Sequence, residues 1–132
     1  MDDRKKKILV VDDDDIIRNS ISDDLKFQEY LVNEAKDGEE GLRLALVEKP
    51  DLILLDIMMP KMNGLEVIQK LREDAWGKRV PVIIISSLNT SDEILNEIIK
   101  NSPTYYIMKK DWDLKDLANK IKNALEFKSG DN

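Results

Sequence analysis

Short apolar runs alternate with segments of helical periodicity along the chain, and this alternation restricts the possible folds more than any other feature. The apolar runs are Ile8–Val11, Tyr30–Val32, Leu52–Leu55, Val82–Ile85 and Tyr105–Met108. All but the second are continuous, which is typical of strands buried on both faces of a parallel sheet. The pattern therefore predicts an α/β fold with five strands.

The segments between the runs carry apolar residues at helical spacing, so each strand is expected to be followed by a helix. Asp37-Gly38 and Asn63-Gly64 precede two of these segments and are typical helix starts. The expected helical faces are Ile16, Ile17, Ile21 and Leu25; Leu42, Leu44, Ala45 and Val47; Leu65, Val67, Ile68 and Leu71; Ile94, Leu95, Ile98 and Ile99; and Leu114, Leu117, Ile121 and Leu125. Five strand–helix units predict one doubly wound domain, with helices on both faces of the sheet.

Polar residues follow four of the apolar runs at the point where each strand should end. They are Asp12 and Asp13, Asp56, Ser86 and Lys109. In a doubly wound sheet these positions share the carboxyl edge, where ligands bind beside the switch in strand order. Chain order alone does not fix strand order, but a flavodoxin-like order of 2-1-3-4-5 would bring the three aspartates into one pocket.

Three clustered carboxylates repel one another unless a cation lies among them. Oxygen ligands suit a hard cation, and an open, partly hydrated site suits Mg²⁺ better than Ca²⁺. The charges of Asp12, Asp13, Asp56, one Mg²⁺ and Lys109 sum to zero. Such a site is arranged to receive one phosphoryl group on a carboxylate.

Composition excludes several classes of protein. The 132 residues include 21 basic and 27 acidic side chains, a formal net charge of −6 without a basic cluster, which argues against binding nucleic-acid phosphates or anionic lipid. Cysteine and histidine are absent, which excludes disulfides, metals bound by either residue and histidine-based catalysis. No apolar run approaches the roughly 20 residues of a membrane span, so we expect a soluble, cytoplasmic domain.

Four motifs, in order, give the chain a specific family resemblance. ILVVDDDDIIR, PDLILLDIMMPKMNGLEVI, PVIIISS and YYIMKKD resemble the receiver (CheY-like) domain of bacterial two-component response regulators. The resemblance spans roughly residues 5 to 127 and implies a receiver domain over 5–127, followed by a short flexible tail over 128–132. It implies a phosphorylation-operated signalling domain and not an enzyme, apart from self-catalysed phosphorylation and dephosphorylation.

The resemblance implies a role for each acidic residue. Asp56 matches the phosphoacceptor. Asp13 is expected to hold Mg²⁺ directly, and Asp12 largely through water. The backbone carbonyl of Met58 matches a main-chain metal ligand. The phosphodonor implied is a phosphohistidine of a sensor histidine kinase.

Further roles fall on the last two strands. Ser86 and Lys109 match residues that contact phosphoryl oxygens, and Tyr106 matches the aromatic residue that reports the phosphorylated state. The expected partner-binding face consists of Ile94–Lys100, Tyr105–Met108 and Leu114–Leu125. The downstream protein that it would bind is not indicated by the sequence.

The chain departs from the family pattern at two places. Lys110 stands where receivers usually carry a proline after the lysine, and Ser102-Pro103 stands where Gly-Ala is common. A cis bond costs about 2.5–4 kcal/mol without proline, against about 0.5–1 kcal/mol with it. We therefore predict a trans peptide bond between Lys109 and Lys110.

Three arrangements of the whole protein fit this sequence. The first is a stand-alone receiver that signals by binding a partner protein. The second is a receiver cut from a longer regulator with a DNA-binding output domain, and the third is a phosphorelay shuttle. A direct nucleic-acid contact or a membrane contact is not expected for the domain itself.

Overall fold

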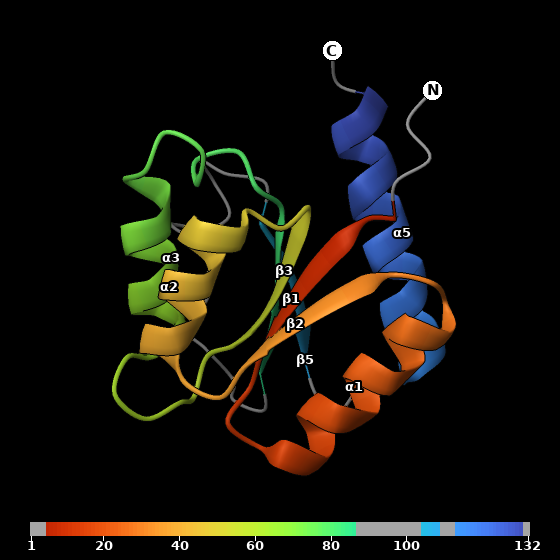
Figure 1. The fold of residues 1–132 in the computed structure, drawn as a ribbon, viewed down its shortest axis with the longest axis horizontal. Coiled ribbons are helices and arrows are strands. Elements are labelled where there is room, and N and C mark those ends of the chain that lie inside the picture. Colours follow the sequence, from red (N-terminus) through yellow and green to blue (C-terminus); the bar gives the residue numbers. More distant parts are fainter. Residues whose placement is uncertain (1–4, 87–103, 109–112, 131–132) are drawn as a thin grey trace.

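The protein forms one five-stranded parallel sheet in the order β2-β1-β3-β4-β5 (Figure 1). The computed structural model describes residues 5–86, 104–108 and 113–130, with backbone alone for residues 86, 104, 106, 108 and 127–130. The strands are β1 (Lys7–Val11), β2 (Leu31–Ala35), β3 (Leu52–Asp56), β4 (Val82–Ser86) and β5 (Thr104–Met108). The predicted fold class and the flavodoxin-like strand order are confirmed.

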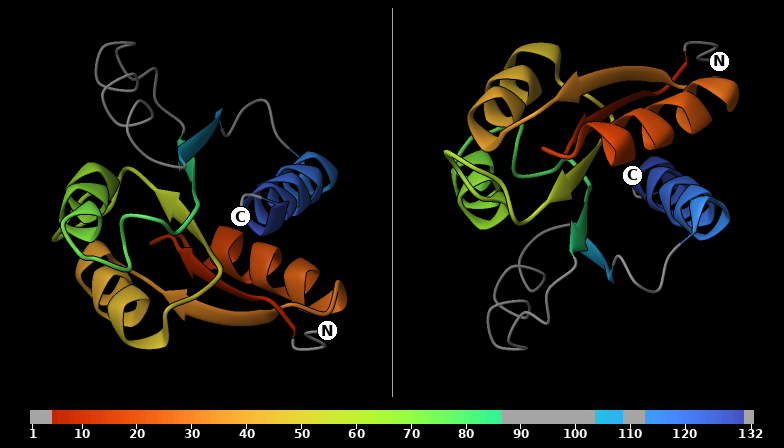
Figure 2. Two further views of the ribbon diagram at one scale, coloured as in Figure 1. Left: turned by 90° about the horizontal axis from the view of Figure 1, so that it is seen from above. Right: turned by 90° about the horizontal axis from the view of Figure 1, so that it is seen from below.

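Different helix pairs cover the two faces of the sheet. The described helices are α1 (Asp15–Phe27), α2 (Gly38–Glu48), α3 (Gly64–Arg72) and α5 (Leu114–Gly130). Helices α2 and α3 lie on one face and α1 and α5 on the other (Figure 2). Helix α5 continues to Gly130, past residue 127, where the sequence suggested that a tail begins.

The continuous apolar strands have a direct physical cause, because both faces of the central strands are buried. Along β1, Ile8 and Val10 pack with α1 and α5, whereas Leu9 and Val11 pack with α2 and α3. Strand β2 lies at the edge of the sheet and is only partly buried. Its last three residues, Asn33–Ala35, include polar side chains, so the predicted run at Tyr30–Val32 was too short.

Three predicted core positions are wrong. Ile16 is 79% exposed on α1, Val47 is 68% exposed on α2, and Leu114 is 38% exposed at the start of α5. Each lies in the first or last turn of its helix. Helical spacing identified the four described helices but could not show which of their terminal turns are exposed.

The helix starts agree with the sequence. The side chain of Asp14 accepts hydrogen bonds from the backbone N–H groups of Ile16 and Ile17 at the start of α1. Asp37 caps α2, and Asn63 caps α3 through a capping box with Glu66. These caps satisfy donors that the first helical turns leave without a backbone partner.

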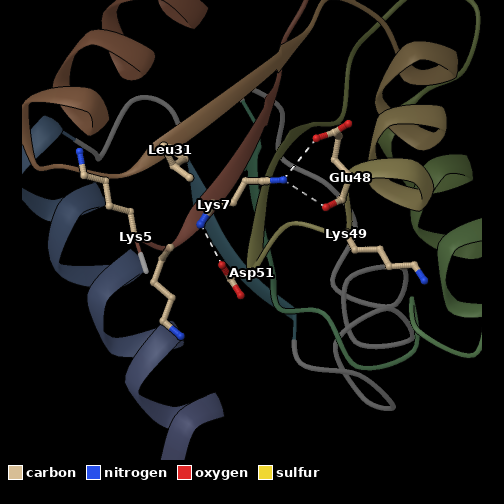
Figure 3. Close-up of a pocket in the computed structure, with 7 residues that line it drawn as sticks. Lys5, Lys7, Leu31, Glu48, Lys49 and Asp51 are labelled. Atoms are coloured by element: carbon tan, nitrogen blue, oxygen red, sulfur yellow. Dashed lines mark hydrogen bonds and ion pairs between the residues drawn. The ribbon is translucent and has the colours of Figure 1, made fainter. Parts of the chain in front are cut away.

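The edge at which the strands begin, called the amino edge below, carries a hollow of about 470 Å³ (Figure 3). Lys7 lies at its centre, where its Nζ is 3.2 Å from Glu48 Oε1 and its backbone N–H donates to Asp51 Oδ2. The lining residues are Lys5, Lys6, Lys7, Leu31, Glu48, Lys49 and Asp51, so four cations meet two anions. The sequence did not reveal this basic grouping, because Lys49 joins it from a distant part of the chain.

A partly buried cation holds the connection between α3 and β4 near the same edge. Arg72 Nη1 donates to the backbone carbonyls of Gly77 and Val80, both at 2.7 Å. Burial lowers the pKa of Arg72 to about 10, so the guanidinium stays charged near neutral pH. Among the described residues, no helix has the length and apolar character needed to cross a membrane.

Candidate metal centre

Three carboxylates meet at the edge where the strands end, called the carboxyl edge below. Strands β1 and β3 are neighbours, with Val11 paired to Leu55, so the residues that follow them, Asp12 and Asp56, lie side by side. One carboxylate oxygen from each of Asp12, Asp13 and Asp56 lies within 4.8 Å of the others. The sequence prediction that these three side chains share one pocket is therefore matched by the geometry.

Burial distinguishes the three acids. Asp12 and Asp56 are 3% and 4% exposed, whereas Asp13 lies on the surface. The Asp13 carboxylate makes no hydrogen bond or ion pair with any residue that the structure describes. It is thus the carboxylate open to water or to a hydrated ion.

The backbone around Asp12 is held from several sides. Its N–H donates to the carbonyl of Ala35 at 3.1 Å, and its Oδ1 accepts from the N–H of Asp14 at 2.9 Å. Its carbonyl accepts from Arg18 Nη1 at 2.8 Å. The loop between β1 and α1 is therefore fixed by hydrogen bonds before any ion is considered.

The donor set of this cluster fits a hard divalent cation. Three carboxylates within 4.8 Å repel one another, and burial of two of them strengthens that repulsion. All the side-chain ligands are oxygen atoms, which suit Mg²⁺ or Ca²⁺, and one open side leaves room for water ligands. The residues present could hold a metal ion.

The segment after Asp56 folds back against the strand that carries it. The N–H of Gly64 donates to the carbonyl of Ile57 at 2.9 Å. A Cβ on Gly64 would lie 2.5 Å from the backbone oxygen of Asp56, so only glycine allows this approach. Met58 lies in this segment with a half-exposed side chain.

Helix α2 supports the other end of that segment. A Cβ on Gly38 would lie 1.8 Å from the carbonyl oxygen of Met62, and Asp37 Oδ2 is 3.6 Å from Lys61 Nζ. The N–H of Glu40 donates to Asp37 Oδ1 at 2.9 Å. This bond, together with Lys61, holds the pKa of Asp37 below its usual value although burial opposes it.

The remaining predicted site residues are placed only by the backbone or lie outside the described residues. Ser86 ends β4, beside Asp56 at the end of β3, and Tyr106 pairs with Ile84 in the sheet. The side chains of both are not described. Lys109 and the Lys109–Lys110 peptide bond lie outside the described residues, as does Ile94–Lys100.

Sequence reasoning assigned no role to Arg18, although the residue stood within the first motif. Its side chain reaches the Asp12 carbonyl, Glu34 on β2 and Asp15. Its position one helical turn after the Asp14 cap could have indicated that it faces back toward the acidic loop. The missing information was the approach of Glu34 from another strand.

Comparisons with known proteins agree with this geometry. A family model described as "Response regulator receiver domain" matches residues 8–122. The nitrate/nitrite response regulator protein NarL of Escherichia coli is 38% identical over 94 residues, which are 71% of this chain and 42% of that protein. The DNA-binding dual master transcriptional regulator RpaA of Synechocystis sp. is 32% identical over 109 residues, which are 83% of this chain and 44% of that protein.

A solved structure extends the likeness to the whole fold. The CheY-like response regulator receiver domain protein from Methanospirillum hungatei JF-1 has a TM-score of 0.86 and 30% identity, and covers 98% of this chain and 100% of that one. The chain spans less than half the length of the two curated relatives named above. With the family match covering most of its residues, the chain belongs to the response regulator receiver domain family.

Proposed function

We propose that Asp56 accepts a phosphoryl group from a phosphohistidine of a sensor histidine kinase. The observation that carries the proposal is the position of Asp56, buried at the end of β3 with oxygens of Asp12 and Asp13 within 4.8 Å. A phosphohistidine donor must lie on another protein, because this chain contains no histidine. The proposed unit is residues 5–127, acting in the cytoplasm, where the ATP that charges histidine kinases is present.

The proposed chemistry joins one oxygen of Asp56 to phosphorus as the bond between phosphorus and the imidazole nitrogen breaks. The imidazole leaves, and an acyl phosphate remains on Asp56. Transfer of this kind depends on positioning and on neutralising the charge of the phosphoryl oxygens. Later attack of water on the acyl phosphate would release phosphate and restore the carboxylate.

Asp12, Asp13 and the backbone carbonyl of Met58 would hold Mg²⁺ beside Asp56. When bound, Mg²⁺ supplies positive charge that offsets the three carboxylates and the phosphoryl oxygens. Asp13 is the exposed member, so it suits direct contact with an ion that keeps several waters. Asp12 is already bonded to the Asp14 N–H through Oδ1, which supports a contact made largely through water.

The proposal gives the other phosphoryl oxygens to Ser86 and Lys109. Support comes from the backbone, since β4 ends at Ser86 beside the end of β3. Phosphorylation would then alter partner binding through the face formed by Tyr105–Met108, α5 and residues 94–100, with Tyr106 responding to the state of Asp56. A new charge shifts a conformation only where it interacts differently with two states.

Phosphorylation of the purified chain tests the acceptor. With Mg²⁺ and acetyl phosphate or phosphoramidate, intact-mass spectrometry should show one added phosphoryl group, stable in acid and labile in base. Asp56→Asn should remove the label, because an amide is not a nucleophile here. Asp51→Asn is the matched control at the amino edge and should be labelled normally. Labelling of Asp56→Asn at the wild-type level would place the acceptor elsewhere.

Mg²⁺ titration followed by amide NMR tests the metal site separately. Asp13→Ala should lose most of the Mg²⁺ affinity because it removes a direct ligand. Asp23→Ala removes an exposed acid further along α1 and should bind Mg²⁺ as the wild type does. Equal affinity of Asp13→Ala and the wild type would contradict the proposed ligand set.

A second candidate is a receiver that forms part of a longer regulator with a DNA-binding output domain. The observation that favours it is the length of the relatives, one of which is described as DNA-binding and is covered by this chain over only 44% of its length. The full reading frame of the gene distinguishes this arrangement from a stand-alone receiver. The phosphoacceptor chemistry would be the same in both.

A further inference from the structure

Arg18 joins three separate segments around the acidic cluster. Its Nη1 donates to the carbonyl of Asp12 at 2.8 Å, and its Nε donates to Glu34 Oε1 at 3.2 Å. Its Nη2 is 2.5 Å from Asp15 Oδ1. The Arg18 side chain is 13% exposed, whereas its partners Asp15 and Glu34 are 76% and 32% exposed.

The carbonyl bond to Arg18 acts on the peptide between the two acids. The carbonyl of Asp12 belongs to the peptide group that links Asp12 to Asp13, and the N–H on the other side of Asp12 is bonded to Ala35. Rotation of either peptide would break one of these bonds. Because Asp13 makes no other bond among the described residues, its direction depends on the orientation of this peptide.

The charge of Arg18 is already balanced by two carboxylates, Asp15 and Glu34. The guanidinium is planar and can direct several N–H groups at fixed angles, which a lysine ammonium does not do. The bond to the uncharged Asp12 carbonyl is therefore a geometric constraint more than a charge interaction.

We propose that Arg18 is a positioning residue that fixes the Asp12–Asp13 peptide so that both carboxylates point toward one cation. The inference rests on the proposed function, in which these acids hold Mg²⁺. Residues that orient metal ligands typically contribute about 10–100-fold to metal affinity.

If only charge mattered, removal of Arg18 would strengthen Mg²⁺ binding and not weaken it. This difference in sign makes the inference testable. Removing Arg18 leaves Asp15 and Glu34 without their cation, so the acidic edge becomes more negative. By Coulomb's law that change strengthens Mg²⁺ binding. Loss of positioning weakens it, so the sign of the change separates the two effects.

The test is Mg²⁺ titration by amide NMR and calorimetry on the full chain. Arg18→Met should weaken Mg²⁺ binding by about 10-fold. Arg18→Lys keeps the positive charge but loses the planar set of N–H donors, and it should also weaken Mg²⁺ binding. Arg43→Met, an exposed arginine on α2, is the matched control and should not weaken it. Urea denaturation of each variant confirms that the Mg²⁺ titration is made on folded protein.

Unchanged or tighter Mg²⁺ binding in folded Arg18→Met would overturn the inference. If Arg18→Met does not fold, Arg18→Lys decides, and wild-type Mg²⁺ affinity in that variant overturns the inference equally. Asp13→Ala is titrated in parallel. Normal Mg²⁺ binding by Asp13→Ala means that the proposed metal site itself has failed, whereas loss in Asp13→Ala alone means that only the role of Arg18 is wrong.

Discussion

The two edges of the sheet differ in the signs of the charges that lie close together. At the carboxyl edge, Asp12, Asp13 and Asp56 bring three like charges within 4.8 Å, and two of the three are buried. At the amino edge, the Lys7 ammonium pairs with Glu48 and the Lys7 backbone N–H donates to Asp51, so each of these carboxylates faces a hydrogen-bond donor (Figure 3). The first arrangement opposes folding and the second favours it.

Burial of charge by itself does not distinguish the edges. Arg72 is also largely buried, but two backbone carbonyls at 2.7 Å face its guanidinium. The acidic cluster differs because its charges have the same sign. A cluster of like charges held by a hydrogen-bonded backbone is the physical feature that marks the functional edge.

The largest expected effect tests the rigid support of the carboxyl edge. Gly38→Ala would place a Cβ 1.8 Å from the Met62 carbonyl oxygen, so α2 or the segment after Asp56 must move. We expect a loss of about 3 kcal/mol in the free energy of unfolding, measured by urea denaturation. Alanine raises helix propensity by about 1 kcal/mol, so a net loss identifies the clash.

Gly41→Ala provides the control for that prediction. Its Cβ would meet the methyl groups of Val11 at 2.8 Å and 3.0 Å, and these belong to a side chain that can shift. The loss should therefore be smaller than for Gly38→Ala. Equal losses would show that the backbone contact with Met62 is not a rigid support.

The next effect concerns pH. The pKa of Asp37 is lowered by the hydrogen bond from the Glu40 N–H and by Lys61, against the effect of burial. A carboxyl with a lowered folded-state pKa stabilises the protein above its unfolded pKa and loses that contribution as pH falls through the folded pKa. Asp37→Ala should cost about 1 kcal/mol near neutral pH, as loss of a helix cap does.

The cost of Asp37→Ala should shrink as pH falls below the unfolded-state pKa of about 4 and through the lower folded-state pKa, because the wild-type carboxyl then becomes protonated. Urea denaturation of both proteins at several pH values measures the difference. Asp51→Ala, which removes the acceptor of the Lys7 backbone N–H, is the comparison at the amino edge. A cost for Asp37→Ala that rises on acidification would contradict a lowered pKa for the Asp37 carboxyl in the folded protein.

Most substitutions lower the free energy of unfolding, but removal of one of these like charges should raise it. Asp13→Asn relieves repulsion with Asp12 and Asp56, so without Mg²⁺ it should stabilise the fold by about 0.5–1 kcal/mol. Saturating Mg²⁺ should cancel that gain, because it binds the wild type more tightly. Thermal unfolding with and without Mg²⁺ measures both effects, and destabilisation of Asp13→Asn in metal-free buffer would contradict the proposed repulsion.

The sequence predicted the cluster of Asp12, Asp13 and Asp56 on the condition of a 2-1-3-4-5 strand order, because strand ends in a parallel sheet share one edge and that order makes the first and third strands neighbours. It could not predict that Ile16 is exposed, since spacing shows the face of a helix but not which of its terminal turns other elements cover. Arg18 and the Lys49 side of the amino-edge hollow were missed for a different reason. Glu34 approaches Arg18 from another strand and Lys49 approaches Lys7 from a distant segment, and local sequence does not record either approach.

The smallest expected effect lies at the amino edge and completes the comparison. Lys7 Nζ and Glu48 Oε1 are 3.2 Å apart, with each side chain about a third exposed to solvent. Exposed ion pairs contribute about 0.2–1 kcal/mol, because water and side-chain entropy offset most of the Coulomb attraction. A double-mutant cycle with Lys7→Met and Glu48→Gln should give a favourable coupling free energy of a few tenths of a kcal/mol. That coupling should fall as salt is added, since ions screen exposed charges, whereas the stabilisation by Asp13→Asn should persist better because two of its neighbours are buried. An unfavourable coupling between Lys7 and Glu48 would mean that the amino edge also carries net repulsion. The difference in charge interactions between the two edges would then no longer identify the carboxyl edge as the functional one.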